Sequence, residues 1–494
     1  MIYGQKEGMK AMSEYVIKGY EPARLFEFFE EISRIPRGSG NEMGIADYLV
    51  RFAEARGIEC YRDALHNVLY RIPATAGREE EPSVLLQGHT DMVCEKNGDT
   101  VHDFMTDPLK LFVKDGRLYA KGTTLGADDG VAVAAMMAAA DGMIPSHPAL
   151  ECLFTVSEEV GLDGANGFDY TQIRSRILFN MDSEEEDAVI VGCAGGVRSD
   201  LLLTPKWQRR TGAVYEIALK GLKGGHSGED INKGRENANK LVGRILTKLV
   251  ALTDLRIVSI VGGSKDNAIP RECTAVVAFP KADADAVVAK AKAEIEAIAK
   301  ELSEDDGGFV GTVKRVKRNV LPERMCDRSS SQKLITLLGC VRNGVLKMSY
   351  GVKGFVEWSR SLGVIETKGD VIRVVFSSRS SIEDQLDASI AELNALAALV
   401  GAEIRHHGRY PGWAYNPDSA IREKYLRICR EELNCPSTAR VIHAGLECGV
   451  IASNLPGLDA ISFGPNLADI HSPEESLDLA STERFWKKLV ALLR

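Results

Sequence analysis

The chain has 494 residues, of which 45% are hydrophobic and 27% are charged, and its formal net charge at pH 7 is −9. This length and composition are typical of a soluble globular protein with two or more domains, and no apolar run is long enough to span a membrane. The excess of acidic residues argues against nucleic acid or an anionic membrane as a partner, because both select a basic surface.

The N-terminal sequence MIYGQKEGMKAMSEYV lacks the apolar core and the small-residue cleavage site of a secretory signal peptide. The ten cysteines form no CxxC pair, which in a chain of this size indicates free thiols and not a disulfide framework. From these two features we expect a cytoplasmic location.

The first part of the chain alternates helical apolar spacing with short apolar runs. Two amphipathic helices are predicted over 22–34 and 41–56, and an alanine-rich buried helix over 130–141. Strands are predicted at 58–61, 68–72, 84–88, 150–156 and 176–181, with a hairpin over 109–119. This alternation predicts a three-layer α/β domain.

The pattern changes after residue 196. From Val214 onward the predicted order is strand, helix, strand, strand, helix, strand, which is the ferredoxin-like pattern. Residues 330–400 continue it with a short helix, strands and a helix over 383–400, as an incomplete second copy of the same layout. These segments predict an inserted α+β domain.

After Gly401 the α/β pattern returns. We predict strands at 403–407, 439–443 and 459–463 and helices over 419–433 and 474–493. The simplest organisation is a discontinuous α/β catalytic domain made of residues 1–196 and 400–494. An α+β lid domain of residues 197–399 would then interrupt it.

The strand that begins at Val84 ends in Gly88-His89-Thr90-Asp91. Ligands gather at strand ends in α/β sheets. There an imidazole can bind a metal while a carboxylate two residues later fixes the ring. The alternative is a surface histidine beside a capping aspartate.

Three further acidic segments occupy comparable loops. Asp128-Asp129 lies between glycines before the buried helix, and Glu158-Glu159 and Asp182 each follow a predicted strand. A helix cap for the first pair and a solvated turn for the second are the alternatives. Far downstream, His471 in the segment DIHSPEE has no evident structural task.

Taken together, these loops place two imidazoles and three carboxylates on one α/β domain, namely His89, Asp128, Glu159, Asp182 and His471. This set suits two Zn²⁺ ions that share one bridging carboxylate, and the same ligands accept Co²⁺ or Mn²⁺. A hydroxide bridging two metals is a nucleophile at neutral pH, and Glu158 can take the proton and deliver it to a leaving amine. The chemistry that fits this set is amide hydrolysis.

Several segments around these residues resemble those of a known family. The segments GHTDMV, GADDG, SEEVG, MDSE and DIHSPEE, in this order, are similar to those of the co-catalytic dizinc peptidase family of aminoacylases, carboxypeptidases and dipeptidases. The resemblance runs from about Ile35 to the C-terminal helix and includes HNVLYR, KGGHSGEDINKGRENANKL and IHAGLECG. The ordered set is specific, whereas any single segment is not.

The resemblance implies a role for each residue of the metal centre. His89 and Asp182 would hold one zinc ion, Glu159 and His471 the other, and Asp128 would bridge them. The peptide from Asp128 to Asp129 is cis in this family. Glu158 would be the general base, and Asp91 would orient His89.

The inserted domain resembles the lid domain of the same family. His226 in the segment GGHSG would stabilise the oxyanion, although a merely flexible turn is the alternative. Asn267 and Arg379 resemble residues that bind a substrate carboxylate, for which the arginine fork is suited. Gly445 and Glu447 match a substrate-loop segment, and Glu447 could contact a free α-amino group.

The function that follows is a metal-dependent dipeptidase that hydrolyses short peptides of the Xaa-His or β-alanyl-histidine type with broad specificity. An N-acyl amino acid deacylase or a tripeptidase on the same dizinc site is the alternative. A non-catalytic scaffold would lack a ligand or the base, and the sequence lacks neither. The predicted partner is a small peptide. A homodimer is possible, with His226 acting in its own subunit or in a partner's.

Overall fold

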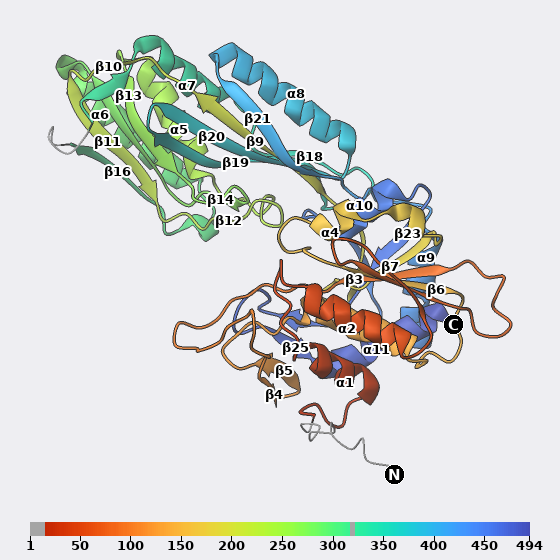
Figure 1. Cartoon of the computed structure of the whole chain (residues 1–494). Coiled ribbons are helices and arrows are strands. Elements are labelled where there is room, and N and C mark those ends of the chain that lie inside the picture. The colour runs from red at the N-terminus through yellow and green to blue at the C-terminus, as the bar shows by residue number, and fades with distance from the viewer. Residues whose placement is uncertain (1–14, 317–321) are drawn as a thin grey trace. The chain divides into compact units, whose positions relative to one another are not determined.

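The computed structural model describes residues 15–316 and 322–494. These residues form two compact units (Figure 1). Unit 1 contains the described residues up to Val191 together with 416–440 and 450–494, and unit 2 contains 192–415 and 441–449. No helix among the described residues is long and apolar enough to cross a membrane. Most of the N-terminal segment in which we expected no signal peptide lies outside them.

Unit 1 is built on an eight-stranded sheet with the order β1-β2-β6-β3-β7-β23-β8-β22. Its strands are β1 (Glu59–Arg62), β2 (Val68–Ile72), β3 (Val84–His89), β6 (Leu150–Thr155), β7 (Ile177–Asn180), β8 (Ala188–Cys193), β22 (Thr438–Ile442) and β23 (Asp459–Ser462). The central strands β6, β3, β7 and β23 run parallel. All residues of β3 and β6 are buried, as expected for strands covered on both faces.

Helices and a smaller sheet complete unit 1. The helices are α1 (Ala23–Ile32), α2 (Met43–Glu54), α3 (Ala127–Ala140), α4 (Asp163–Gly167), α9 (Ala420–Arg427), α10 (Glu447–Asn454, which begins in unit 2) and α11 (Leu479–Leu493). The small sheet has the order β24-β25-β5-β4, from β4 (Leu111–Lys114), β5 (Arg117–Ala120), β24 (Leu467–Ala468) and β25 (Ser476–Asp478). Helix α3 packs on β3 and α1, and α9 packs on β23 and α11.

Unit 2 contains a nine-stranded antiparallel sheet with the order β16-β11-β15-β13-β19-β20-β9-β21, and β18 also pairs with β19. Its strands are β9 (Gly195–Leu203), β11 (Ala213–Lys220), β13 (Arg256–Gly262), β15 (Cys273–Phe279), β16 (Val310–Arg315), β18 (Gly344–Met348), β19 (Val356–Lys368), β20 (Val371–Ser380) and β21 (Glu403–Tyr410). Two short pairs lie beside it: β10 (Trp207–Arg209) with β17 (Arg324–Cys326), and β12 (Gly225–His226) with β14 (Ala268–Ile269).

The helices of unit 2 are α5 (Ala238–Val250), α6 (Ala284–Glu301), α7 (Arg328–Cys340) and α8 (Glu383–Val400). Each contributes buried side chains to one apolar core with the strands, for example Leu246, Ala291, Leu338 and Leu393. The fold-class prediction of an α/β domain with an inserted α+β unit is confirmed by this architecture and by the comparisons below.

The sheet of unit 2 consists of two ferredoxin-like halves. In the first half, β11-α5-β13-β15-α6-β16, the strands take the spatial order fourth, first, third, second. In the second half, β9, α7, β19, β20, α8 and β21 take the mirror-image order across the sheet. The two second strands, β13 and β19, pair at Val261 with Glu366 and at Gly262 with Ile365. The copy that looked incomplete in the sequence is therefore complete, with β9 as its first strand.

Two predicted elements differ from the structure. The strand expected in the returning α/β domain at 403–407 is β21, which pairs with β9 in unit 2, so that Ile404 packs against the core there. The last helix begins at Leu479 and not at 474. The reason is that Ser476–Asp478 pair with β5, and Asp478 then caps the helix by accepting from the Ser481 N–H.

Candidate metal centre

Three adjacent parallel strands of the unit 1 sheet carry candidate metal ligands at their carboxyl ends. His89 ends β3, Glu158 and Glu159 follow β6, and Asp182 follows β7. Because β6, β3 and β7 are adjacent and parallel, these ends meet at one edge of the sheet.

Two further loops of unit 1 bring the remaining candidates. Asp128 lies at the start of α3, after Gly126 with φ 66°, and its peptide bond to Asp129 is cis, as the resemblance implied. His471 lies between β24 and β25 with φ 59°.

These side chains form two groups that share Asp128. One group is His89, Asp128 and Asp182, and the other is Asp128, Glu159 and His471. The His89 Nε2 lies 3.1 Å from Asp128 Oδ1 and 3.8 Å from Asp182 Oδ1. The His471 Nε2 lies 3.2 Å from Asp128 Oδ2 and 3.0 Å from Glu159 Oε1.

The donor set fits two metal ions. Tetrahedral ligands about 2.0–2.2 Å from zinc are about 3.3–3.6 Å from one another, close to the spacings between these donor atoms. Imidazole nitrogens with carboxylate oxygens suit zinc, and cobalt and manganese accept the same ligands. The two oxygens of Asp128 each face a different imidazole, as a bridging carboxylate requires.

Asp91 supports both the ring of His89 and the loop after β6. Its Oδ1 lies 3.3 Å from His89 Nδ1, and both side chains are essentially inaccessible to solvent. The Asp91 carboxylate also accepts from Ser39 Oγ at 2.7 Å and from the backbone N–H groups of Glu158 at 3.0 Å and Glu159 at 3.3 Å. One buried carboxylate therefore orients a ligand and the loop that carries the candidate base.

The protonation behaviour of the cluster reflects crowded negative charge. Burial alone would raise the pKa of Asp128, but hydrogen bonds from His471 and His89 outweigh it and lower that pKa. Burial and the carboxylates of Asp129 and Asp128 raise the pKa of Asp182. Hydrogen bonds to Asp128 and Glu159 raise the pKa of His471 to about 10. The raised pKa of Asp182 expresses repulsion between carboxylates, which a bound cation would relieve.

Glu158 forms a third group of possible ligands with His89 and Glu159, but it belongs to neither of the two groups that share Asp128. One of its carboxylate oxygens lies within 4.8 Å of a His89 nitrogen and of a Glu159 oxygen. The side chain is partly exposed, which leaves it accessible to a substrate. This position suits a group that exchanges a proton at the centre.

A second set of candidates gathers within unit 2. His226 on β12 pairs with Ala268 on β14, and the Ser227 N–H donates to the Asn267 carbonyl at 2.8 Å. The His226 Nε2 lies 3.4 Å from Arg379 Nη2. His226, predicted to stabilise the oxyanion, is thus a neighbour of Arg379 and of the segment that carries Asn267, the two predicted substrate binders, although the three residues come from both halves of the unit.

Tyr410 and His443 join this set, and sequence reasoning assigned neither of them a role. Arg379 Nη1 donates to Tyr410 Oη at 2.9 Å. The His443 Nε2 lies 2.7 Å from Ser359 Oγ. Burial, with Arg379 and His226 nearby, lowers the pKa of His443 to about 3, so its ring is neutral at pH 7. Burial and Arg379 also lower the pKa of His226.

The substrate-loop candidates differ in their surroundings. A Cβ at Gly445 would lie 2.8 Å from the ring of Tyr410, so only glycine fits there without movement. Glu447, at the start of α10, has no exposed surface. The predicted contact of Glu447 with a substrate amino group remains a prediction that this burial does not favour.

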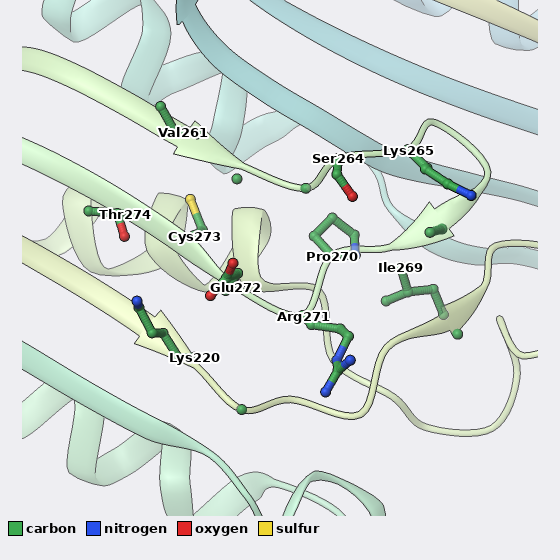
Figure 2. A pocket seen from close by; sticks show the side chains of 15 residues that line it. Lys220, Val261, Ser264, Lys265, Ile269, Pro270, Arg271, Glu272, Cys273 and Thr274 are labelled. Carbon is green, nitrogen blue, oxygen red and sulfur yellow. The ribbon is translucent and has the colours of Figure 1, made fainter. Parts of the chain in front are cut away.

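A separate cavity of about 720 Å³ lies in unit 2 beside the β12–β14 pair (Figure 2). Lys220, Lys265, Arg271 and Glu272 give its rim a mixed charge with a basic excess. Among the described residues that line it, none is a predicted substrate-binding residue.

Comparison with known proteins gives consistent matches over nearly the whole chain. The model of Peptidase family M20/M25/M40 matches residues 85–494. The cytosol non-specific dipeptidase of Escherichia coli (strain K12) is 36% identical over 479 residues, which cover 96% of this chain and 97% of that protein.

Solved structures match as well. The aminoacylhistidine dipeptidase of Vibrio alginolyticus is 38% identical, with a TM-score of 0.90 over 97% of this chain and 98% of that one. The aminopeptidase PepT of Bacillus cereus ATCC 10987 is 16% identical, with a TM-score of 0.56 over 96% of this chain and 98% of that one. This last similarity shows a shared fold alone.

Proposed function

Because the chain belongs to peptidase family M20/M25/M40, we propose that it is a metal-dependent dipeptidase whose site holds two metal ions. The observation that carries this proposal is the pair of ligand groups in unit 1 that share Asp128. The names of its relatives in Escherichia coli and Vibrio alginolyticus, both dipeptidases, support the reaction class.

The chemistry divides between the metals and the chain. When bound, two divalent cations would polarise the scissile carbonyl and lower the pKa of a water molecule. Glu158 takes the proton of the attacking water as the new C–O bond forms. It then passes that proton to the nitrogen of the leaving amine as the C–N bond of the tetrahedral intermediate breaks. Asp91 keeps the His89 ring and the Glu158 loop in position during this transfer.

Unit 2 is proposed as the lid domain, with its cluster contacting the substrate. The Arg379 guanidinium, with Asn267 on the segment that bonds to Ser227 beside His226, suits a free substrate carboxylate. The His226 ring suits hydrogen bonding to the oxyanion. Such recognition selects short peptides with a free C-terminus.

The base is tested with Glu158→Ala. We expect the variant to keep its metal content while kcat falls by about 10²–10⁴-fold, the usual contribution of a general base. The matched control is Glu80→Ala, which removes an exposed carboxylate of the same unit. Hydrolysis near the wild-type rate by metal-loaded Glu158→Ala would contradict the assigned role.

The substrate class and the metal are finer parts of the proposal. We propose zinc as the metal and Xaa-His or β-alanyl-histidine peptides as good substrates within a broad range. Rates on Ala-His, β-Ala-His, N-acetyl-Ala-His and a tripeptide, measured after loading with zinc, cobalt or manganese, test both points. A preference for the blocked peptide would favour a deacylase, and a preference for the tripeptide would favour a tripeptidase.

We also propose a cellular location and an oligomeric state. The name of the Escherichia coli relative supports a cytoplasmic location. A homodimer remains part of the proposal, and sedimentation of the purified protein tests it. If the protein is monomeric and active, His226 acts within its own chain.

A further inference from the structure

Two buried ionic side chains of unit 1, Arg37 and Glu475, lie beside the metal centre without belonging to its ligand groups. Arg37 is 1% exposed and Glu475 is 2% exposed. Burying a charged group is costly unless hydrogen bonds compensate it. The contacts of each side chain therefore indicate what the burial serves.

Glu475 binds the backbone of the loop that carries Asp128. Its Oε2 accepts from the N–H groups of Leu125 at 2.9 Å and Gly126 at 3.1 Å. Its Oε1 accepts from Ala127 at 2.8 Å and from Asp128 at 3.4 Å. Glu475 itself follows His471 by four residues, so it joins the loop of one candidate ligand to the backbone of another.

Arg37 binds the opposite side of the same loop. Its Nη2 donates to the Gly126 carbonyl, and its Nη1 donates to the carbonyls of Thr90 at 2.9 Å and Asp91 at 3.2 Å. Arg37 therefore joins the loop of Asp128 to the segment that follows His89.

Gly126 is held from both sides. Its N–H donates to Glu475 and its carbonyl accepts from Arg37. A Cβ at this position would lie 2.6 Å from Arg37 Nη2 and 2.8 Å from the Met92 sulfur, and the φ of 66° also favours glycine. The backbone before Asp128 is thus held by hydrogen bonds on both sides.

We propose that Arg37 and Glu475 are positioning residues that fix Asp128 between His89 and His471. The three loops come from distant parts of the sequence, and these two buried side chains hydrogen-bond from one loop to the next. Neither side chain binds metal. Each acts by setting where the two oxygens of Asp128 lie. This inference rests on the proposed metal centre.

The charge and shape of Glu475 both matter for this role. Four backbone N–H groups, from Leu125 to Asp128, lie before the regular turns of α3 and converge on two carboxylate oxygens, and such a group of N–H donors favours an anion. Glutamine has one oxygen and an NH₂ group, so it cannot accept from all four. Replacement of the supporting partners of metal ligands typically weakens metal binding about 10–100-fold.

The experiment compares Glu475→Gln with Glu474→Gln. Glu474 is the adjacent residue, is exposed, and hydrogen-bonds to Ser472 of its own turn. Metal affinity is measured by competition with a chromophoric chelator, below the melting temperature of each metal-free variant. We expect Zn²⁺ to bind Glu475→Gln about 10–100-fold more weakly, and Glu474→Gln to bind it as the wild type does.

A second variant tests the hydrogen bond from Arg37 to the other side of the Asp128 loop. Arg37→Met removes the donors to Gly126, and Arg34→Met is its control because Arg34 is exposed. A merely structural role lowers the melting temperature of the metal-free and metal-loaded forms equally and leaves the Zn²⁺ affinity unchanged, and that result would overturn the inference. If the wild type itself binds no metal, the proposed metal centre fails instead.

Discussion

Individual side chains in unit 2 show how a substrate carboxylate could be recognised by neighbours with different chemistry. Arg379 is 7% exposed and has Tyr410 on one nitrogen and His226 near the other. The pKa of His226 is lowered, first by its burial and then by Arg379, so Arg379 carries the positive charge of this pair at pH 7. Arg379 is therefore the cation of this cluster, and its position depends on the uncharged hydroxyl group of Tyr410.

Tyr410→Phe tests that dependence. The phenyl ring keeps the packing against Gly445, but Arg379 loses the oxygen that accepts from its Nη1. We expect kcat/KM for dipeptides to fall about tenfold, the effect of losing a hydrogen bond to a charged group worth about 1.5 kcal/mol. Peptides with an amidated C-terminus should not show this change, and neither should the control Tyr350→Phe on the exposed Tyr350. An equal effect on both peptide classes would contradict the argument.

Sequence patterns pointed to the candidate metal ligands, but they did not point to the residues that hold other groups in position. His89, Asp128 and Glu159 stand in short segments that contain glycine, Asp182 and His471 stand in short acidic segments, and the structure brings all five together. Arg37, Tyr410, His443 and Glu475 act through backbone groups or through other side chains, so no local spacing marks them. In the sequence, Glu475 is only the second of two adjacent glutamates in DIHSPEE, and nothing there indicates its contacts.

At the scale of elements, the second half of the unit 2 sheet was the hardest to predict. Its first strand, β9, is separated from α7 by the whole first half, so the two belong to one layout only in space. Periodicity predicted most strands and helices to within a few residues, because it depends on local burial. Strand pairing depends on distant partners, which explains why β21 was placed in the wrong domain.

An ion pair between α8 and β19 gives a test of how a helix and a strand of unit 2 stabilise each other. Arg360 on β19 is fully buried, and its Nη1 donates to Glu392 on α8 at 2.8 Å. Burial opposes ionisation of Glu392, but hydrogen bonds from Arg342 and Arg360 outweigh it and lower its pKa. A carboxyl with a lower pKa in the folded state stabilises the fold above its unfolded pKa, and this contribution is lost as the pH falls through the folded value.

Glu392→Gln should therefore destabilise unit 2 at pH 7. We expect a loss of about 2 kcal/mol in the free energy of unfolding, below the ~3–5 kcal/mol for a fully buried pair because Glu392 is partly exposed. The difference from the wild type should shrink as the pH falls below about 4. Urea unfolding followed by tryptophan fluorescence measures it, with Glu296→Gln on the exposed face of α6 as the control. A pH-independent difference would contradict the ion-pair explanation.

At the scale of the whole molecule, the candidate residues are divided between the two units. All five candidate ligands lie in unit 1, whereas His226, Asn267, Arg379 and Tyr410 lie in unit 2. A ligand stabilises only the cooperative unit that binds it. Two units with separate cores need not unfold in one transition.

Metal removal should thus affect one thermal transition and not the other. We expect chelation to lower the transition of unit 1 and to abolish peptide hydrolysis, and both should return when zinc is added back. Phe463→Ala, which removes a ring packed against Phe179, Tyr425 and Phe485, identifies the unit 1 transition in calorimetry. Leu362→Ala in the core of unit 2 identifies the other. A chelation shift confined to the Leu362 transition would contradict this assignment of the metal centre.

The short pair β10–β17 has a consequence for how this chain could have been assembled. Strand β10 precedes the first half of the unit 2 sheet and β17 follows it, and the two strands pair from Trp207 with Cys326 to Arg209 with Arg324. The chain therefore leaves the second half and returns to it at neighbouring points, which is the geometry that tolerates insertion of one folded segment into another. The intervening segment contains the whole first half of the sheet. A gene encoding one half could have received the other at this point without interrupting a single strand of its host.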